Sequence, residues 1–171
     1  MPPVSRLGRQ LQEAIACLER AGSSAALIGG LALARYKVVR ATHDVDLLAE
    51  ALRTDDIDRE LLAVGYVCLY RSPDAATYVR GDERVDLLYA SRPADQRWLD
   101  TADEVVTPFG TLRVVQLAGL ESLSSRVVAP RAPVPTGNPY QRLDDLMAVV
   151  EALCPVWPQR EIGGPMNDLR L

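Results

Sequence analysis

A four-residue pattern, Val-Asp-Leu-Leu, occurs twice in the chain, at residues 45–48 and again at 85–88. Both copies lie in short apolar segments typical of buried β-strands, where a carboxylate is costly to bury unless it has a partner. If the two strands are neighbours in one sheet, Asp86 can join Asp46. Asp44 shares the strand face of Asp46, because side chains alternate along a strand. The pattern therefore predicts that three carboxylates converge.

Converging carboxylates repel one another unless they are protonated or joined by cations. Their oxygens are hard ligands, so a set formed by Asp44, Asp46 and Asp86 suits Mg²⁺ or Mn²⁺ rather than zinc. A structural interpretation stays open for each acid. Asp44 and Asp46 could be solvated at an exposed strand end, and Asp86 could pair with Arg84 or Arg80.

A glycine pair lies upstream of these acids. Residues 25–28 form a short apolar run that ends in Gly29 and Gly30, and the following residues favour a helix over 31–37. Glycine lets a phosphate approach the backbone closely, and the start of a helix offers unpaired N–H groups. A plain strand-to-helix turn would need the same residues. Together with three carboxylates that can hold two divalent ions, however, the pair indicates phosphoryl or nucleotidyl transfer.

The remaining segments alternate between helical and β-prone patterns. Amphipathic spacing predicts a helix over 4–21, and Thr54 with the acids that follow it predicts another over 54–64. Further predicted elements are strands at 44–49, 66–70, 76–80 and 84–89, a hairpin over 104–107 and 111–115, helices at 93–100, 117–128 and 140–153, and a loop at 130–139. We predict one α/β (α+β) domain over 1–154, a small mixed sheet surrounded by helices, and a tail over 155–171.

Composition narrows the classes of function. The chain has 19 Lys and Arg against 23 Asp and Glu, a net charge of −4, and only two Trp, six Tyr and one Phe. These counts disfavour a broad nucleic-acid-coating surface or a base-stacking platform. No run approaches the ~18 apolar residues of a membrane span. Cys17, Cys68 and Cys154 are far apart, so we expect them to be reduced, in a cytoplasmic protein.

The segment Ile-Gly-Gly-Leu-Ala at 28–32, followed by Arg-Ala-Thr-His-Asp-Val-Asp-Leu-Leu at 40–48, resembles the nucleotidyltransferase superfamily that includes DNA polymerase beta. More narrowly, it resembles the abortive-infection (AbiEii-type) toxin nucleotidyltransferases. The resemblance implies the nucleotidyltransferase fold, a nucleoside triphosphate as substrate and Mg²⁺ or Mn²⁺ as cofactor. It implies that four residues contact the nucleotide: Gly29, Gly30, Arg40 and Thr42. It also implies metal binding and catalysis by Asp44, Asp46 and Asp86, the last of which would help to activate the acceptor hydroxyl.

The family pattern is less complete further along the chain. Related toxins tend to carry a lysine in the helix after the third Asp, and residues 120–126 contain none. Their later helix carries the pattern Arg-x-Lys-Asp-x-x-Asp, which residues 142–145 (Arg-Leu-Asp-Asp) match only in part.

The function implied is transfer of NMP from an NTP to a hydroxyl of tRNA, a protein or a small molecule, as a toxin neutralised by a cognate antitoxin or as part of phage defence. Two alternatives stay open. One is an adenylyltransferase acting on an aminoglycoside or lincosamide antibiotic. The other is a catalytically silent fold that serves as a binding or regulatory module.

Overall fold

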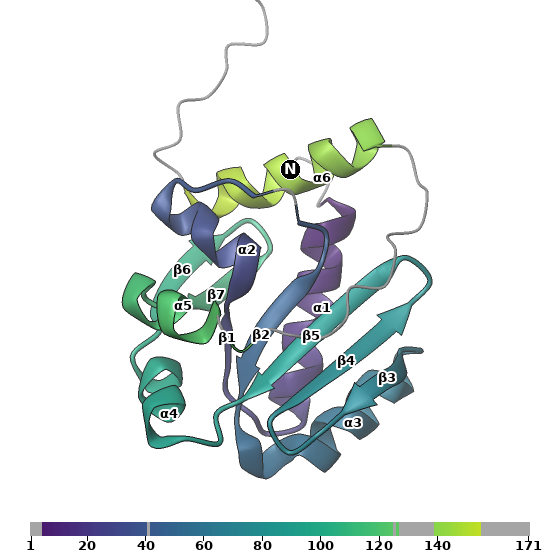
Figure 1. Cartoon of the computed structure of the whole chain (residues 1–171). Helices are drawn as coiled ribbons and strands as arrows, with labels where there is room; N and C mark the ends of the chain where they lie inside the picture. Colours follow the sequence, from purple (N-terminus) through teal and green to yellow (C-terminus); the bar gives the residue numbers. More distant parts are fainter. Residues whose placement is uncertain (1–4, 41, 125, 127–138, 155–171) are drawn as a thin grey trace, which may run out of the picture.

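The computed structural model describes residues 5–40, 42–124, 126 and 139–154; the predicted tail over 155–171 lies outside them. Within the described residues, seven strands form one mixed sheet in the order β3-β4-β5-β2-β1-β7-β6 (Figure 1). The strands are β1 (Ala25–Leu27), β2 (Val45–Ala49), β3 (Val67–Arg71), β4 (Ala75–Arg80), β5 (Glu83–Tyr89), β6 (Asp103–Thr107) and β7 (Gly110–Val114). The α-helices are α1 (Arg6–Arg20), α2 (Gly29–Leu33), α3 (Thr54–Ala63), α4 (Pro93–Asp100), α5 (Leu117–Ser124) and α6 (Pro139–Leu153). This is the mixed α/β architecture that the sequence predicts.

The two Val-Asp-Leu-Leu copies lie side by side at the centre of the sheet. Strands β2 and β5 pair in parallel, and residues 45–48 align one for one with residues 85–88. Val45 and Leu47 point to one face and are fully buried, and their counterparts on β5 do the same. Asp46 and Asp86 therefore share the opposite face. The prediction that these strands are neighbours is confirmed.

Helices α1 and α3 pack behind the sheet in the view of Figure 1. Helix α1 is capped by Ser5, whose hydroxyl accepts a hydrogen bond from the Gly8 N–H at 3.0 Å, and the helix buries Leu11 and Leu18 completely. Helices α2 and α5 contact each other, and α4 packs against α5. The apolar core lies between the sheet and α1 and α3, which leaves the carboxylate face accessible beside α2 and α5.

The structure corrects the predicted start of the second helix. The sequence places a turn at Gly29-Gly30 and a helix over 31–37, whereas α2 begins at Gly29 and passes into a 3-10 turn over Ala34–Tyr36. The reason is that Gly29 has φ +68°, which lets the chain leave β1 and enter the helix within one residue. Helix α5 ends at Ser124, earlier than the predicted 128. Residues 127–138, which include most of the predicted loop, lie outside the described residues.

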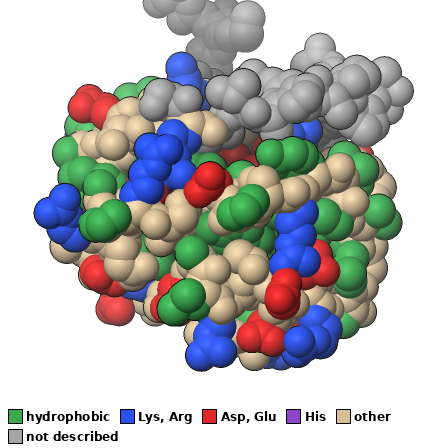
Figure 2. All heavy atoms as spheres, turned by 60° about the horizontal axis from the view of Figure 1, so that its bottom comes forward, with side chains coloured by type: hydrophobic (Ala, Val, Ile, Leu, Met, Phe, Trp, Pro, Cys, Tyr) green, Lys and Arg blue, Asp and Glu red, His purple; other side chains and the backbone are tan. Residues whose placement is uncertain are grey.

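The mixture of surface charges and the state of the cysteines can be compared with what the composition predicts. On the face shown in Figure 2, Lys and Arg side chains are interspersed with Asp and Glu side chains. Cys17 and Cys154 are buried, Cys68 is partly buried, and all three thiols are free. In the described part of the chain, none of the helices combines the length and the apolar character needed to cross a bilayer.

Candidate active site

The sheet topology brings the predicted acidic residues to one cavity. Asp46 and Asp86 are direct cross-strand neighbours, and Asp44 lies immediately before β2. All three line a cavity of about 720 Å³. Gly29 and Gly30 line the same cavity. The glycine pair and the three acids lie in different parts of the sequence, and the fold brings them together around one cavity.

The glycine pair touches the residues around the acids. A Cβ atom on Gly29 would lie 2.2 Å from Oδ2 of Asp46, and one on Gly30 would lie 2.9 Å from Cγ2 of Thr42. Such distances are shorter than any van der Waals contact, so each side chain requires glycine opposite it. The turn from β1 into α2 therefore lies directly against the Asp46 carboxylate.

Thr42 and Arg40 occupy the rim of this cavity. The hydroxyl oxygen of Thr42 accepts a hydrogen bond from the backbone N–H of Asp44 at 3.4 Å. Thr42 thus links the glycine turn to the segment that carries the first acid. Arg40 is exposed and contributes a guanidinium to the cavity lining.

Asp86 has two partners of its own. Its Oδ1 accepts a hydrogen bond from the Thr77 hydroxyl at 2.6 Å, and its Oδ2 accepts one from Nε of Arg84 at 2.7 Å. The side chains of Arg84 and Asp86 are only 13% and 15% exposed, so water screens this ion pair weakly. Of the two partners considered from the sequence, Arg84 is the one present. Arg80 instead pairs with Glu83.

The positive charge of Arg84 interacts with the negative charges of all three acids. The hydrogen bond to Asp86 raises the pKa of the Arg84 guanidinium above its ordinary value, and the negative charges of Asp86, Asp44 and Asp46 add to this rise. A fixed cation thereby offsets part of the repulsion between the carboxylates. Among the residues that the structure describes, no group of three or more His, Cys, Asp and Glu side chains is arranged to hold a metal ion.

The donor set nevertheless matches the chemistry of Mg²⁺. Asp44, Asp46 and Asp86 offer only carboxylate oxygens, the hard ligands that Mg²⁺ prefers. The carboxylate of Asp46 occupies the position that a side chain at residue 29 would take, so Gly29 allows Asp46 to lie directly against the turn. The residues present therefore fit Mg²⁺ in the chemistry of their donor atoms, while Asp86 is paired with Arg84 in the structure.

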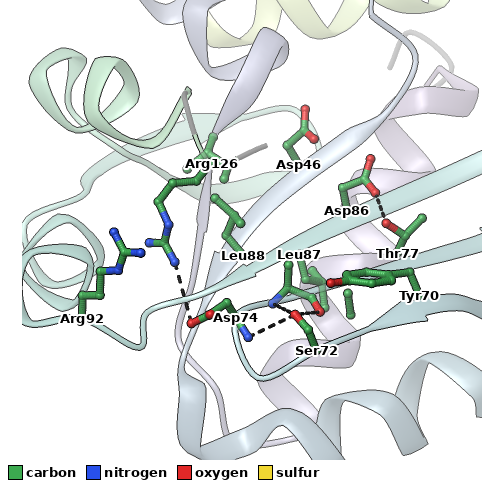
Figure 3. A pocket seen from close by; sticks show the side chains of 13 residues that line it. Asp46, Tyr70, Ser72, Asp74, Thr77, Asp86, Leu87, Leu88, Arg92 and Arg126 are labelled. Carbon is green, nitrogen blue, oxygen red and sulfur yellow. Dashed lines mark hydrogen bonds and ion pairs between the residues drawn. The ribbon is translucent and has the colours of Figure 1, made fainter. Parts of the chain in front are cut away.

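A second cavity adjoins the first at the two central acids (Figure 3). It has a volume of about 320 Å³ and shares Asp46 and Asp86 with the first cavity. Cross-strand register puts Tyr70, Thr77, Asp86 and Asp46 in one row across β3, β4, β5 and β2. Thr77 and Tyr70 carry no signal in the sequence, because their alignment with Asp86 depends on strand register, which no local motif specifies.

The fold is similar to that of solved nucleotidyltransferase structures. No protein-family model matches the sequence, and no curated protein matches it significantly. The solution structure of the antibiotic-resistance factor ANT(2″)-Ia is 17% identical, with a TM-score of 0.50 over 85% of this chain and 87% of that chain. The crystal structure of ANT(2″)-Ia in complex with adenylyl-2″-tobramycin is 16% identical, with a TM-score of 0.51 over 85% and 92%.

A third similar structure is the lincomycin-bound lincosamide antibiotic adenylyltransferase LnuA. It is 13% identical and has a TM-score of 0.54 over 82% of this chain and 96% of that chain. At these identities the similarity establishes the fold alone. The chain therefore has the nucleotidyltransferase fold, as its sequence predicts. The narrower resemblance to AbiEii-type toxins stays a prediction.

Proposed function

We propose that this protein is a metal-dependent nucleotidyltransferase that moves NMP from an NTP to a hydroxyl acceptor. The observation that carries the proposal is the alignment of Asp46 with Asp86 on neighbouring parallel strands, beside Asp44 and the glycine pair in one cavity. The shared fold supports the same activity. A cavity of about 720 Å³ is large enough for a nucleotide, since ligand sites typically span about 300–1,000 Å³.

Each residue has a role in this proposal. The backbone of Gly29 and Gly30 contacts the phosphates, and Arg40 orients the triphosphate. Thr42 supports both, because it packs against Gly30 and accepts from the N–H of Asp44. Mg²⁺ or Mn²⁺ held by Asp44, Asp46 and Asp86 supplies Lewis-acid stabilisation of the charge on the phosphates.

The transfer is a displacement at the α-phosphorus. An oxygen of the acceptor hydroxyl forms a bond to that phosphorus while the bond to the bridging oxygen of the β-phosphate breaks, and pyrophosphate leaves with the electron pair. Asp86 takes the hydroxyl proton, directly or through water. Thr77 positions Asp86 for this role through its hydrogen bond to Oδ1.

Two other functions each have an observation in their favour. The structural neighbours include an adenylyltransferase of lincosamides and a complex with an adenylylated tobramycin, which favours an antibiotic as acceptor. The Arg84–Asp86 ion pair favours a silent fold, because a guanidinium already neutralises the third carboxylate. A toxin or phage-defence role is tested separately, by growth arrest on expression that a neighbouring gene product relieves.

The decisive experiment is transfer from α-labelled NTPs. The protein is incubated with each NTP and Mg²⁺, and with tRNA, cell lysate, tobramycin or lincomycin as acceptor. We expect label to move to one acceptor class, and the Asp46→Asn and Asp86→Asn variants to lose at least about a hundredfold in rate, the scale of a proton-transfer residue. Asp56→Asn is the matched control, because Asp56 lies on the outer surface of α3 and pairs with Arg59.

The outcomes separate the three functions. Label on tobramycin or lincomycin alone identifies an antibiotic-modifying enzyme. Nucleotide binding without transfer to any acceptor, measured by fluorescence of a labelled ATP analogue, identifies a silent module. Equal transfer by wild type and by a folded Asp46→Asn variant contradicts the assigned site.

A further inference from the structure

The 320 Å³ cavity lies where an acceptor would have to sit. It shares Ile28, Asp46 and Asp86 with the larger cavity but contains neither glycine of the pair. A molecule bound there contacts the two central acids and neither glycine of the pair. In a displacement at phosphorus, the attacking and leaving oxygens lie on opposite sides of the transferred group. With the nucleotide in the larger cavity, which contains the glycine pair, as the proposed function has it, the smaller cavity is left for the acceptor.

The floor of this cavity is a row of hydroxyl and carboxylate groups. Tyr70, Thr77 and Asp86 are aligned across β3, β4 and β5 and line it together. Thr77 is 4% exposed and its hydroxyl donates a hydrogen bond to Asp86, so Thr77 positions that acid. A hydroxyl of the ligand placed at this row lies beside Asp86, the residue that would take its proton.

Two guanidiniums lie at the end of the cavity away from Asp86, as Figure 3 shows. Nη1 of Arg126 donates a hydrogen bond to the carboxylate of Asp95, which is 4% exposed and holds the guanidinium in place. Its other terminal nitrogen points toward Asp74 at 3.9 Å, a distance too long for a direct hydrogen bond. Arg92 is exposed and forms no ion pair with any residue in the described ranges.

We infer that the acceptor is a small hydroxyl compound that carries a phosphate or carboxylate group, which Arg92 and Arg126 bind while its hydroxyl faces Asp86. Guanidiniums recognise both anions through paired N–H donors. The volume of about 320 Å³ suits a small molecule rather than a folded partner. This inference rests on the proposed function for its reaction but predicts anion binding by itself. A polycation such as tobramycin would have to place ammonium groups against the two arginines.

Binding is measured on the full chain by NMR, with glycerol 3-phosphate, glycerate, glycerol and tobramycin as probes. We expect the two anions to shift the backbone amide signals of Ser72, Ala75 and Leu88 and the Nε signal of Arg92. Glycerol, which has no charge, serves as the neutral counterpart. Glycerol 3-phosphate and glycerate distinguish a phosphate from a carboxylate as the preferred group.

The variants are chosen to leave the fold intact. Arg92→Glu changes an exposed side chain, and we expect it to weaken anion binding by at least about tenfold, the effect of one charge-assisted contact. Arg97→Glu is the matched control, because Arg97 is exposed on α4, the helix that directly follows Arg92, but does not line the cavity. It should leave the affinity within about twofold.

Three results would overturn the inference. They are anion shifts confined to Gly29 and Gly30, equal affinity in Arg92→Glu and wild type, or tobramycin binding at Ser72, Ala75 and Leu88 in place of the anions. The proposed function fails separately. If NTP labelling is absent while Arg92 still binds the anions, the pocket stands and the transfer reaction does not. If labelling occurs on tobramycin or lincomycin, transfer stands and the anionic acceptor does not.

Discussion

Gly29 and Asp46 are in such close contact that a single added methyl group would overlap the carboxylate. Its Cβ would lie 2.2 Å from Oδ2 of Asp46, and the backbone there has φ +68°. Two requirements, a left-handed backbone and an empty space, coincide at one residue. Gly29, the first residue of α2, therefore determines how closely the backbone of the glycine turn can approach Asp46.

The Gly29→Ala variant should separate these two requirements when it is compared with Gly81→Ala. Gly81 has φ +62° and nothing within 4 Å of its added Cβ, so its substitution carries backbone strain alone, about 1–2 kcal/mol. Gly29→Ala adds a steric overlap, and we expect it to lower the free energy of unfolding by roughly 2–5 kcal/mol in total. Urea unfolding measures both. Equal losses in the two variants would show that the contact with Asp46 is unimportant.

Replacing Arg84 by Met should strengthen Mg²⁺ binding if the three acids hold the ion. Arg84 now hydrogen-bonds Asp86 and feels the charge of Asp44 and Asp46, so it competes with any cation at the site. We expect the dissociation constant for Mg²⁺, measured by calorimetry, to fall about tenfold. The apoprotein should be less stable, because Asp86 loses a weakly screened partner.

Arg113→Met is the control for that measurement. Arg113, on β7, donates to the backbone oxygen of Leu99 in α4 and does not line either cavity. It should leave Mg²⁺ binding unchanged. Weaker Mg²⁺ binding in Arg84→Met than in wild type would instead assign Arg84 a supporting role at the site.

Thr77→Val should remove the hydrogen bond to Asp86 while keeping the shape of the side chain. The hydroxyl lies 2.6 Å from Oδ1 in a residue that is 4% exposed, so its loss leaves one carboxylate oxygen without a protein donor. We expect the free energy of unfolding to fall by about 1.5–3 kcal/mol, the range for bonds to charged groups. Thr77→Ser keeps the hydroxyl and should lose less. The hydrogen bond contributes nothing measurable if Ser and Val prove equally destabilising.

Alkaline pH should destabilise the fold through its buried tyrosines. Burial is the main cause that raises the pKa of Tyr78 and of Tyr89 above the ordinary value of 10.0. A group whose pKa is higher in the folded state contributes stability that is fully present below its unfolded pKa and is lost as pH rises above it. The free energy of unfolding should therefore be steady up to about pH 9, begin to fall near pH 10, and approach a slope of about 1.4 kcal/mol per pH unit for each such tyrosine near pH 11.

Chemical unfolding between about pH 8 and about pH 11 checks this dependence. Tyr78→Phe removes one titrating group and should make the decline shallower. It also removes the hydrogen bond that the Tyr78 hydroxyl donates to Asp58 at 2.8 Å, so its stability at neutral pH should be lower. An unchanged slope in Tyr78→Phe would exclude Tyr78 as a source of the alkaline loss.

Much of the central sheet is predictable because its signals are local. Identical tetrapeptides at 45–48 and 85–88 indicate similar strands, and the apolar run before Gly29 indicates the strand-to-helix turn. The partner of Asp86 could not be decided in the same way. Arg84 lies two residues away on the same strand face, a position compatible with an ion pair or with a separate metal site.

The lining of the 320 Å³ cavity is less predictable still. Arg126 and Asp95 belong to segments 31 residues apart along the chain, and they meet only because α4 and α5 pack together. Thr77 reaches Asp86 because the hairpin of β4 and β5 has one particular register. Such contacts depend on tertiary packing, which propensity and periodicity do not encode.

The matched tetrapeptides also bear on how the chain folds. Side chains alternate between the faces of a sheet, so if β2 slipped by one residue relative to its neighbours, Asp46 would turn toward the apolar layer under α1 and α3. An unpaired carboxylate there would be strongly disfavoured. The acids on which the proposed chemistry depends thus also disfavour wrong alignments of β2. They help to fix the register of the central sheet.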